Sequence, residues 1–193
     1  MRKYISKGER GYLRSRKIKL GIGSLCGFML MALIYLTGFL IYGTAKNYIT
    51  VLAVLVILPT AKIFVQYLLL PWKCNAPEAE YNELSALCLP LKLYCELMIT
   101  AQEKSFEILY LLIGSDDSII AYTANQKSET GKFEKGVTNF LNYYEFDSKV
   151  KLFTDLGQFK KRAKQLAARN QELSDEQREH ISTVFEKISI MSV

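Results

Sequence analysis

Two apolar runs decide the fold class of this chain: LGIGSLCGFMLMALIYLTGFLIY at residues 20–42 and YITVLAVLVILPTAKIFVQYLLL at residues 48–70. Each run has 23 residues. As a helix, such a run extends about 35 Å and can cross the ~30 Å hydrocarbon core of a bilayer with some tilt. The pattern predicts a transmembrane hairpin over residues 20–72, preceded by an arm at 1–19 and followed by one soluble domain at 73–193.

Charge is distributed unevenly along the chain. Its 25 Lys and Arg against 19 Asp and Glu give a formal net charge of +6. The arm has eight basic residues and one acid, or +7, whereas residues 73–193 have 15 basic residues and 18 acids, or −3. A basic arm can bind nucleic acid, but beside an apolar run we interpret it as a topology signal. Nucleic acid stays open as a partner without being favoured.

The short segments that flank the runs indicate the orientation of the hairpin. Cytoplasmic flanks are enriched in Lys and Arg, and the connecting loop at 43–47 has only Lys46. We therefore expect a two-pass protein of the cell membrane with both termini cytoplasmic and the lipid bilayer as a partner. A cleaved signal peptide is the competing interpretation, but its apolar region has only ~7–15 residues, and cleavage would leave the second run unexplained.

Two features inside the hairpin are candidates for functional contacts. Gly23 and Gly27 form a G-x-x-x-G pattern. It favours close packing against the other helix of the hairpin, or alternatively against a second copy of the chain. Lys62 lies deep in the second run, where a lysine costs ~2.5–3.5 kcal/mol on insertion scales, and Gln66 and Lys73 share its helix face. This polar stripe meets a partner, or it reaches the headgroups because the helix tilts or the bilayer thins.

The first half of the domain predicts a helix and a three-stranded antiparallel meander. Residues 75–78 have a helix-start pattern, in which a capping residue is followed three positions later by Glu, and Pro90 ends the helix. Over residues 91–100 apolar side chains alternate with others, including Tyr94 and Glu96, as in a strand with one exposed face. Residues 106–113 are almost wholly apolar, as in a central strand covered on both faces, and residues 119–124 form the third strand.

The second half predicts a helix, a short strand and two further helices. An apolar stripe at helical spacing covers residues 133–144, and a strand follows at 149–153. Thr154 or Asp155 caps the next helix, and Ser174 opens the last one with a capping box. The domain is thus expected to be a small α+β fold of order α-β-β-β-α-β-α-α, mostly antiparallel sheet with helices.

This order resembles the restriction-endonuclease-like (PD-(D/E)XK) fold, whose core runs α-β-β-β-α-β. The resemblance is closest over residues 106–168, where VKLFT at 150–154 and FKKRA at 159–163 are similar to the closing strand and helix of Mrr-type domains. It implies a nuclease with an acid near the second strand and an acid-x-Lys or Gln-x-Lys on the third, which hold a divalent metal. Asp116 and Asp117 could stand near the first position, but IIAYTA at 119–124 has neither an acid nor a lysine. The resemblance therefore implies a domain whose metal site is lost.

Other candidate sites are few. The helix at 160–169 carries Lys160, Lys161, Lys164 and Arg169. These side chains are either a solvated face or a contact for anionic headgroups or a nucleic-acid backbone. His180 is the only histidine and the chain has no C-x-x-C, which disfavours a zinc site. No cofactor is expected, and apart from Asp116 and Asp117 no residue is a candidate for catalysis or metal binding.

These observations favour a membrane-anchored, cytoplasmic-facing module with an interaction or regulatory role, without an enzymatic one. It would hold a protein partner or a second copy of itself. The alternatives are a membrane-tethered, degenerate nuclease-like domain that acts on nucleic acid, and an accessory subunit of a membrane complex.

Overall fold

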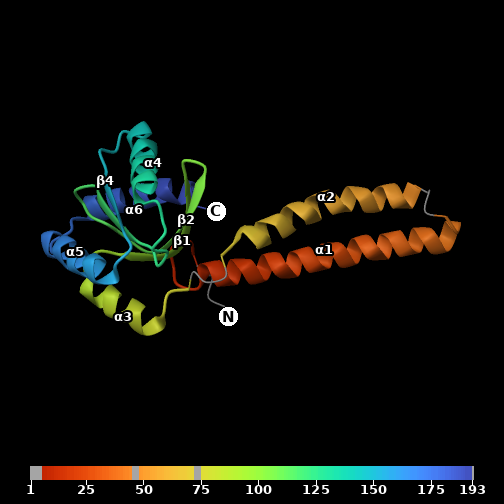
Figure 1. Ribbon diagram of the computed structural model, residues 1–193, viewed down its shortest axis with the longest axis horizontal. Coiled ribbons are helices and arrows are strands. Elements are labelled where there is room, and N and C mark those ends of the chain that lie inside the picture. Colours follow the sequence, from red (N-terminus) through yellow and green to blue (C-terminus); the bar gives the residue numbers. More distant parts are fainter. Residues whose placement is uncertain (1–5, 45–47, 72–74, 193) are drawn as a thin grey trace. The chain divides into compact units, whose positions relative to one another are not determined.

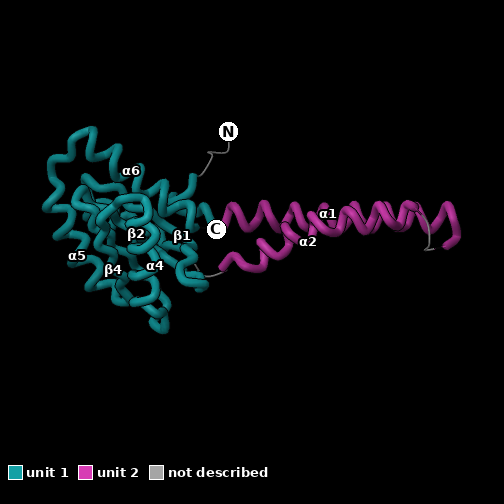
Figure 2. The backbone as a smooth tube through the Cα atoms, turned by 90° about the horizontal axis from the view of Figure 1, so that it is seen from above, with its two compact units in different colours: residues 1–13, 73–193 teal, residues 14–72 magenta. Residues whose placement is uncertain are grey.

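The computed structural model describes residues 6–44, 48–71 and 75–192 (Figure 1). The described residues divide into two compact units (Figure 2). Residues 14–71 form the hairpin unit, and residues 6–13 together with 75–192 form the domain unit. Lys46 of the connecting loop, Lys73 of the polar stripe and the predicted end of the hairpin at residue 72 lie outside the described residues.

Two apolar helices, α1 (Tyr12–Tyr42) and α2 (Tyr48–Leu69), make up the hairpin unit and could span a membrane. Only 11% of the residues in each apolar stretch are buried. Apolar side chains exposed all round a helix are typical of a membrane span and not of the core helix of a soluble protein. α1 begins at Tyr12, well before the apolar run, because the basic residues from Arg14 onward are good helix formers.

The domain unit has a four-stranded sheet between two layers of helices. β1, β2 and β3 are antiparallel neighbours, and β4 pairs with β3 in parallel, so the sheet order is β1-β2-β3-β4. Helices α3 and α5 pack together in one layer, and α4 and α6 in the other (Figure 1). The predicted order and the mainly antiparallel sheet are confirmed. The bounds are β1 Leu93–Ala101, β2 Lys104–Ile113, β3 Ser118–Tyr122, β4 Lys149–Phe153, α3 Glu78–Leu87, α4 Thr130–Tyr143, α5 Leu156–Arg169 and α6 Asp175–Ile190.

The caps of the helices follow the prediction in two cases out of three. Asp155 caps α5, since its carboxylate accepts a hydrogen bond from the Gly157 N–H at 2.8 Å. Ser174 opens α6 with a complete capping box. α3 begins two residues later than the predicted cap at Asn75 implies: its N-cap is Pro77, which has no side-chain acceptor and makes no capping bond.

β1 differs from the predicted strand with one exposed face, and that prediction is wrong. Eight of its nine residues are buried, among them Tyr94 and Glu96. The N-terminal segment covers the strand: the Cys95 N–H donates to the Gly8 carbonyl at 2.8 Å. Gly8 has a φ of +85°, and a Cβ there would lie 2.6 Å from the Phe185 ring, so this approach requires glycine.

The C-terminus also covers the edge of β1. The Thr100 N–H donates to the Met191 carbonyl at 2.9 Å, and Ile99 bridges to Ser192. Lys7 joins the two ends, since its Nζ donates to the carbonyls of Ser189 and Ser192 at 2.7 and 2.6 Å. A cation at the C-terminal end of α6 is favourable because the helix dipole is negative there.

Candidate functional site

The glycines of the G-x-x-x-G pattern lie against α2 of the same hairpin. A Cβ atom on Gly27 would lie 2.5 Å from Thr60 Oγ1, so the close approach at this point requires glycine. A Cβ atom on Gly23 would meet the Ile63 side chain at 3.8 Å, which is an ordinary contact. Of the two glycines, Gly27 is therefore the one with the tighter approach to α2.

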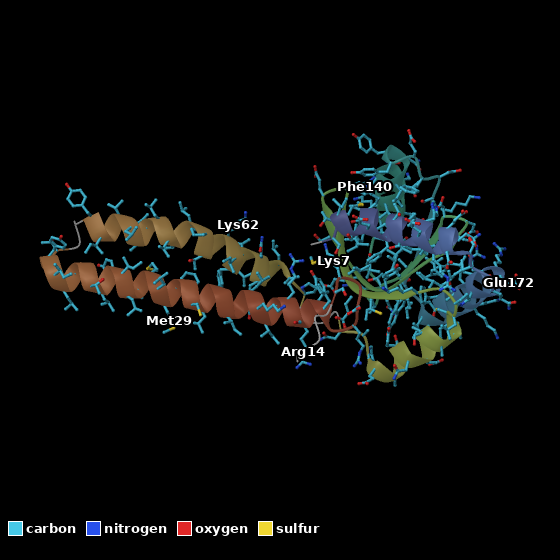
Figure 3. All side chains as sticks on the ribbon, turned by 180° about the vertical axis from the view of Figure 1, so that it is seen from behind. Lys7, Arg14, Met29, Lys62, Phe140 and Glu172 are labelled. Carbon is cyan, nitrogen blue, oxygen red and sulfur yellow. The ribbon has the colours of Figure 1, made fainter. Side chains whose placement is uncertain are left out.

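Lys62 lies on the side of α2 away from α1 (Figure 3). It is exposed, whereas Gln66, one turn later, is half-buried. Lys17 contrasts with it, because its Nζ donates to the Leu70 carbonyl and lies 5.5 Å from the centre of the Tyr67 ring. Lys17 therefore has its hydrogen-bond partner within the hairpin, whereas the charged group of Lys62 points away from the hairpin.

A buried carboxylate binds the two chain segments that flank the hairpin. Glu96 is 1% exposed. Its Oε2 accepts from the Gly11 N–H at 2.8 Å, and its Oε1 accepts from the Ala76 N–H at 3.2 Å. Gly11 directly precedes α1, and Ala76 lies between α2 and α3. We call Glu96, Gly11 and Ala76 the carboxylate clamp.

The pKa and the backbone conformation of Glu96 both indicate that surrounding contacts hold the clamp in place. Burial raises the pKa of Glu96, and the backbone N–H groups of Ala76 and Gly11 partly offset this shift. Glu96 also has a φ of +51°. Such a conformation costs a residue other than glycine ~1–3 kcal/mol and persists only where other contacts enforce it. Arg10 supports the clamp, since its Nε donates to the Ala76 carbonyl at 3.1 Å and its guanidinium pairs with Glu78 at 3.2 Å.

The sequence pattern does not predict the carboxylate clamp. Glu96 stands in an alternating strand pattern, which predicts an exposed position for it. A carboxylate within an apolar strand is a signal for a buried partner, but nothing in the local pattern names Gly11 as that partner.

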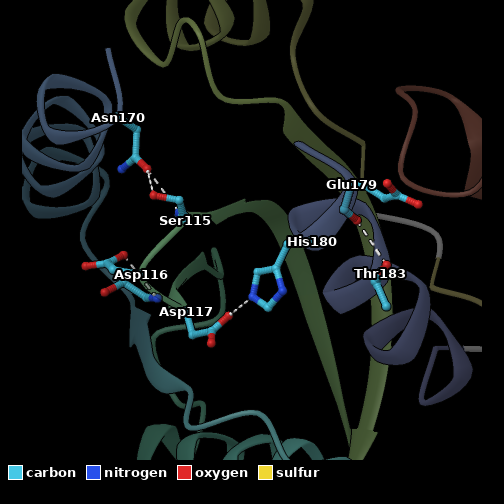
Figure 4. A network of polar contacts seen from close by, with 8 residues as sticks. Ser115, Asp116, Asp117, Asn170, Glu179, His180 and Thr183 are labelled. Carbon is cyan, nitrogen blue, oxygen red and sulfur yellow. Dashed lines mark hydrogen bonds and ion pairs between the residues drawn. The ribbon is translucent and has the colours of Figure 1, made fainter. Parts of the chain in front are cut away.

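Asp116 and Asp117 lie in the turn between β2 and β3 and are held by local contacts (Figure 4). Asp116 Oδ1 accepts from the Ser118 N–H at 3.3 Å. Asp117 Oδ1 lies 2.7 Å from His180 Nε2, and the Asp117 carbonyl accepts from the Lys149 N–H at 3.1 Å. Within residues 6–44, 48–71 and 75–192, no three His, Cys, Asp or Glu side chains cluster as metal ligands would. The two acids thus fix the turn and the start of β4.

A buried amide holds the other side of this turn. Asn170, 4% exposed, accepts from the Ser115 N–H at 3.0 Å and from its hydroxyl at 2.5 Å (Figure 4). Its Nδ2 donates to the Leu166 carbonyl at 2.7 Å. The end of α5 is therefore tied to the β2–β3 turn.

Replacing Asn170 with alanine is expected to lower the free energy of unfolding by about 1–3 kcal/mol, because it leaves the part-buried N–H and hydroxyl of Ser115 without their acceptor. Urea unfolding of the full chain in neutral detergent measures this loss. Asn139→Ala, at an exposed position of α4, is the matched control and should change stability by less than ~0.5 kcal/mol. Equal losses of unfolding free energy for the two variants would contradict a structural role for Asn170.

The basic residues of α5 do not form one unpaired surface. Lys160 is half-buried and pairs with Glu83 of α3 at 2.8 Å. Lys161, Lys164 and Arg169 are exposed. Arg162, which belongs to the same basic helix segment at 160–169, lines a hollow beside β4.

That hollow has a volume of about 380 Å³ and lies between β4 and α5. We call it the basic hollow, because three of its lining side chains are cationic. It is lined by Ser118, Ile120, Lys149, Val150, Lys151, Phe153 and Arg162.

Comparisons with known proteins add no information about these sites. Comparison with protein-family models, with curated proteins and with solved structures gives no match to the chain. The function proposed below therefore rests on the contacts of the molecule itself.

Proposed function

We propose that this chain is a two-pass protein of the cell membrane with both termini cytoplasmic, and that its domain is an interaction or regulatory module without enzymatic activity. The carboxylate clamp is the observation that carries this proposal. Gly11 precedes α1 and Ala76 follows α2, and both donate to the same carboxylate. A domain that binds both segments requires the two ends of the hairpin to lie on the same side of the bilayer.

The charge of the flanks supports the cytoplasmic side. Arg14, Arg16, Lys17 and Lys19 stand at the start of α1, whereas the loop between the helices has only Lys46. Lys and Arg enrichment of this kind marks cytoplasmic flanks. Lys62, which faces away from α1, supports a contact with a partner within the membrane.

Protease protection tests the topology. We expect epitope tags at both termini of the full chain to be protected in right-side-out membrane vesicles until detergent is added. A cysteine placed at Thr44 should react with a membrane-impermeant thiol reagent in the same vesicles. Protection of one tag and cleavage of the other would contradict the two-pass arrangement.

A degenerate nuclease-like domain is the second candidate, and the sheet supports it. The elements α3 to β4 follow each other in the order α-β-β-β-α-β, and β4 pairs with β3 in parallel. Asp116 and Asp117, the only candidate acids, are occupied by contacts within the domain. This occupation supports an inactive domain.

We expect the purified full chain to leave plasmid DNA and single-stranded RNA intact in the presence of Mg²⁺ or Mn²⁺. The chain with Asp116→Ala and Asp117→Ala is the control. Cleavage by the wild type that is lost in this double variant would contradict the proposal and establish an enzyme.

A further inference from the structure

We propose that the basic hollow binds a phosphorylated small molecule that also carries an aromatic ring. Lys149 and Lys151 reach the hollow from β4, and Arg162 reaches it from α5. Lys149 and Lys151 are two positions apart on one strand, so their side chains stand on the same face of the sheet. Arg and Lys are the residues that recognise phosphate, Arg with two parallel hydrogen bonds and Lys as a point charge.

The positive charge of the hollow is only partly compensated. Lys151 Nζ lies 3.4 Å from Glu134 Oε1, an oxygen that also accepts from the Leu152 N–H at 3.0 Å. Arg162 Nη1 donates to Gln165 Oε1 at 3.1 Å, which is a neutral partner. Lys149 has no ion pair within the described part of the chain. Three cations against one acid leave an attraction for an anion.

The charge of the rest of the domain favours a small ligand. Residues 73–193 have a net charge of −3, with 15 basic residues and 18 acids. A long polyanion would extend beyond the hollow over a domain without a net positive charge, whereas a single phosphate group would meet mainly the three cations of the hollow. Electrostatic attraction between exposed charges falls off over ~8 Å at physiological salt. The cations nearest to the ligand therefore determine how strongly an anion binds.

The remaining lining of the hollow is apolar and includes an aromatic ring. Ile120 is 3% exposed, and Val150 and Phe153 are half-buried. The Phe153 ring is held edge-on against the Phe159 ring, 6.4 Å between centres. A planar group of a ligand could therefore pack on Phe153 while its phosphate meets the cations. The volume of about 380 Å³ falls within the ~300–1,000 Å³ of small-molecule pockets.

The network around the β2–β3 turn holds the hollow in place. The Lys149 N–H donates to the Asp117 carbonyl, and the Asp117 carboxylate contacts His180 of α6. The start of β4 is thus fixed by contacts outside the hollow. Side chains on a rigid support lose less conformational entropy when a ligand binds.

Edge protection is the competing explanation for the two lysines, since β4 is an edge strand and lysines discourage pairing with another chain. It does not account for Arg162, which comes from α5, or for the half-buried Phe153 beside it. A ligand accounts for all four side chains.

This inference names a ligand for the module proposed above and rests on that proposal only for the biological setting. The test therefore uses the full chain in neutral detergent, where the result does not depend on topology. AMP and inorganic phosphate are the probes, and calorimetry is the readout. We expect one AMP per chain, bound more tightly than phosphate and more weakly as salt rises.

Three variants locate the site. Lys149→Ala with Arg162→Ala should weaken AMP binding at least about tenfold, because two charge-assisted contacts are lost. Lys161→Ala with Lys164→Ala removes the same net charge from the exposed side of α5 and should leave the affinity unchanged. Phe153→Leu should weaken AMP binding and leave phosphate binding unaltered. Unchanged urea midpoints show that each variant is folded.

Several outcomes would overturn the proposal. One is the absence of saturable binding of AMP and phosphate to the folded full chain. Equal losses in the hollow and control variants would show that only net charge matters. Binding of phosphatidylglycerol vesicles or of a single-stranded oligonucleotide without binding of AMP would assign the cations to a lipid surface or a nucleic acid instead.

Discussion

Replacing Glu96 with alanine is expected to lower the free energy of unfolding of the domain by about 2–5 kcal/mol. The substitution leaves the N–H groups of Gly11 and Ala76 without their acceptor, and each unsatisfied buried group costs ~1–3 kcal/mol. Alanine also keeps the unfavourable φ of +51° at this position. Urea or thermal unfolding of the full chain in neutral detergent measures the loss.

Glu107→Ala is the matched control for this prediction. Glu107 lies on β2, is half-buried and faces Met98 across the strand pair. Its removal leaves no backbone group of the clamp unpaired, so it should change stability by less than ~1 kcal/mol. A Glu96→Ala chain as stable as the control would show that the carboxylate does not hold the flanking segments.

Glu96 also gives the stability a defined dependence on pH. Because burial raises its pKa above the ordinary value of 4.5, the folded state binds the proton more tightly than the unfolded state. The stability that this group contributes is fully present below the unfolded pKa and is lost as pH rises through the folded pKa. Glu96→Gln should remove this component, so the difference between wild type and variant should change with pH in that window. A constant difference between pH 4 and pH 7 would contradict it.

Replacing Gly27 with alanine is expected to disrupt the packing of α1 on α2. The new Cβ would lie 2.5 Å from Thr60 Oγ1, and overpacking of this kind costs ~1–3 kcal/mol. Titration of the hairpin from mild detergent into SDS, followed by fluorescence transfer between its two ends, measures the loss of contact.

Gly23→Ala is the control on the same helix. Its Cβ would meet Ile63 at 3.8 Å, which requires no displacement. Both substitutions raise helix propensity by the same ~1 kcal/mol, so the comparison isolates packing. Equal midpoints for the two variants would contradict the close approach at Thr60.

Much of the fold could be predicted because it depends on local patterns. The lengths of the two apolar runs predicted the hairpin, and the change from a period of two to a helical period predicted the order of elements in the domain. Asp155 and Ser174 act within one turn of their own positions, so their caps were also predictable. The packing of Gly27 was foreseen as a class of contact, but Thr60 could not be named.

The parts that failed depend on residues far apart in the chain. Glu96 was placed on an exposed face because its cover comes from Gly11, 85 residues away. Lys160 was grouped with the exposed lysines of α5, but Glu83, 77 residues away, binds it. The basic hollow combines β4 with α5, and only the folded sheet brings Lys149 beside Arg162. Sequence periodicity reports which face is apolar, and it does not report which distant segment covers that face.

The carboxylate clamp is tested most directly by hydrogen exchange at the amides of Gly11 and Ala76, measured on the full chain in a bilayer nanodisc. We expect both amides to be protected to the level of the β1 amides in the wild type. In Glu96→Ala both should lose protection together, while the amides of β2 keep theirs. Exchange of either amide at the rate of an exposed loop in the wild type would contradict the clamp.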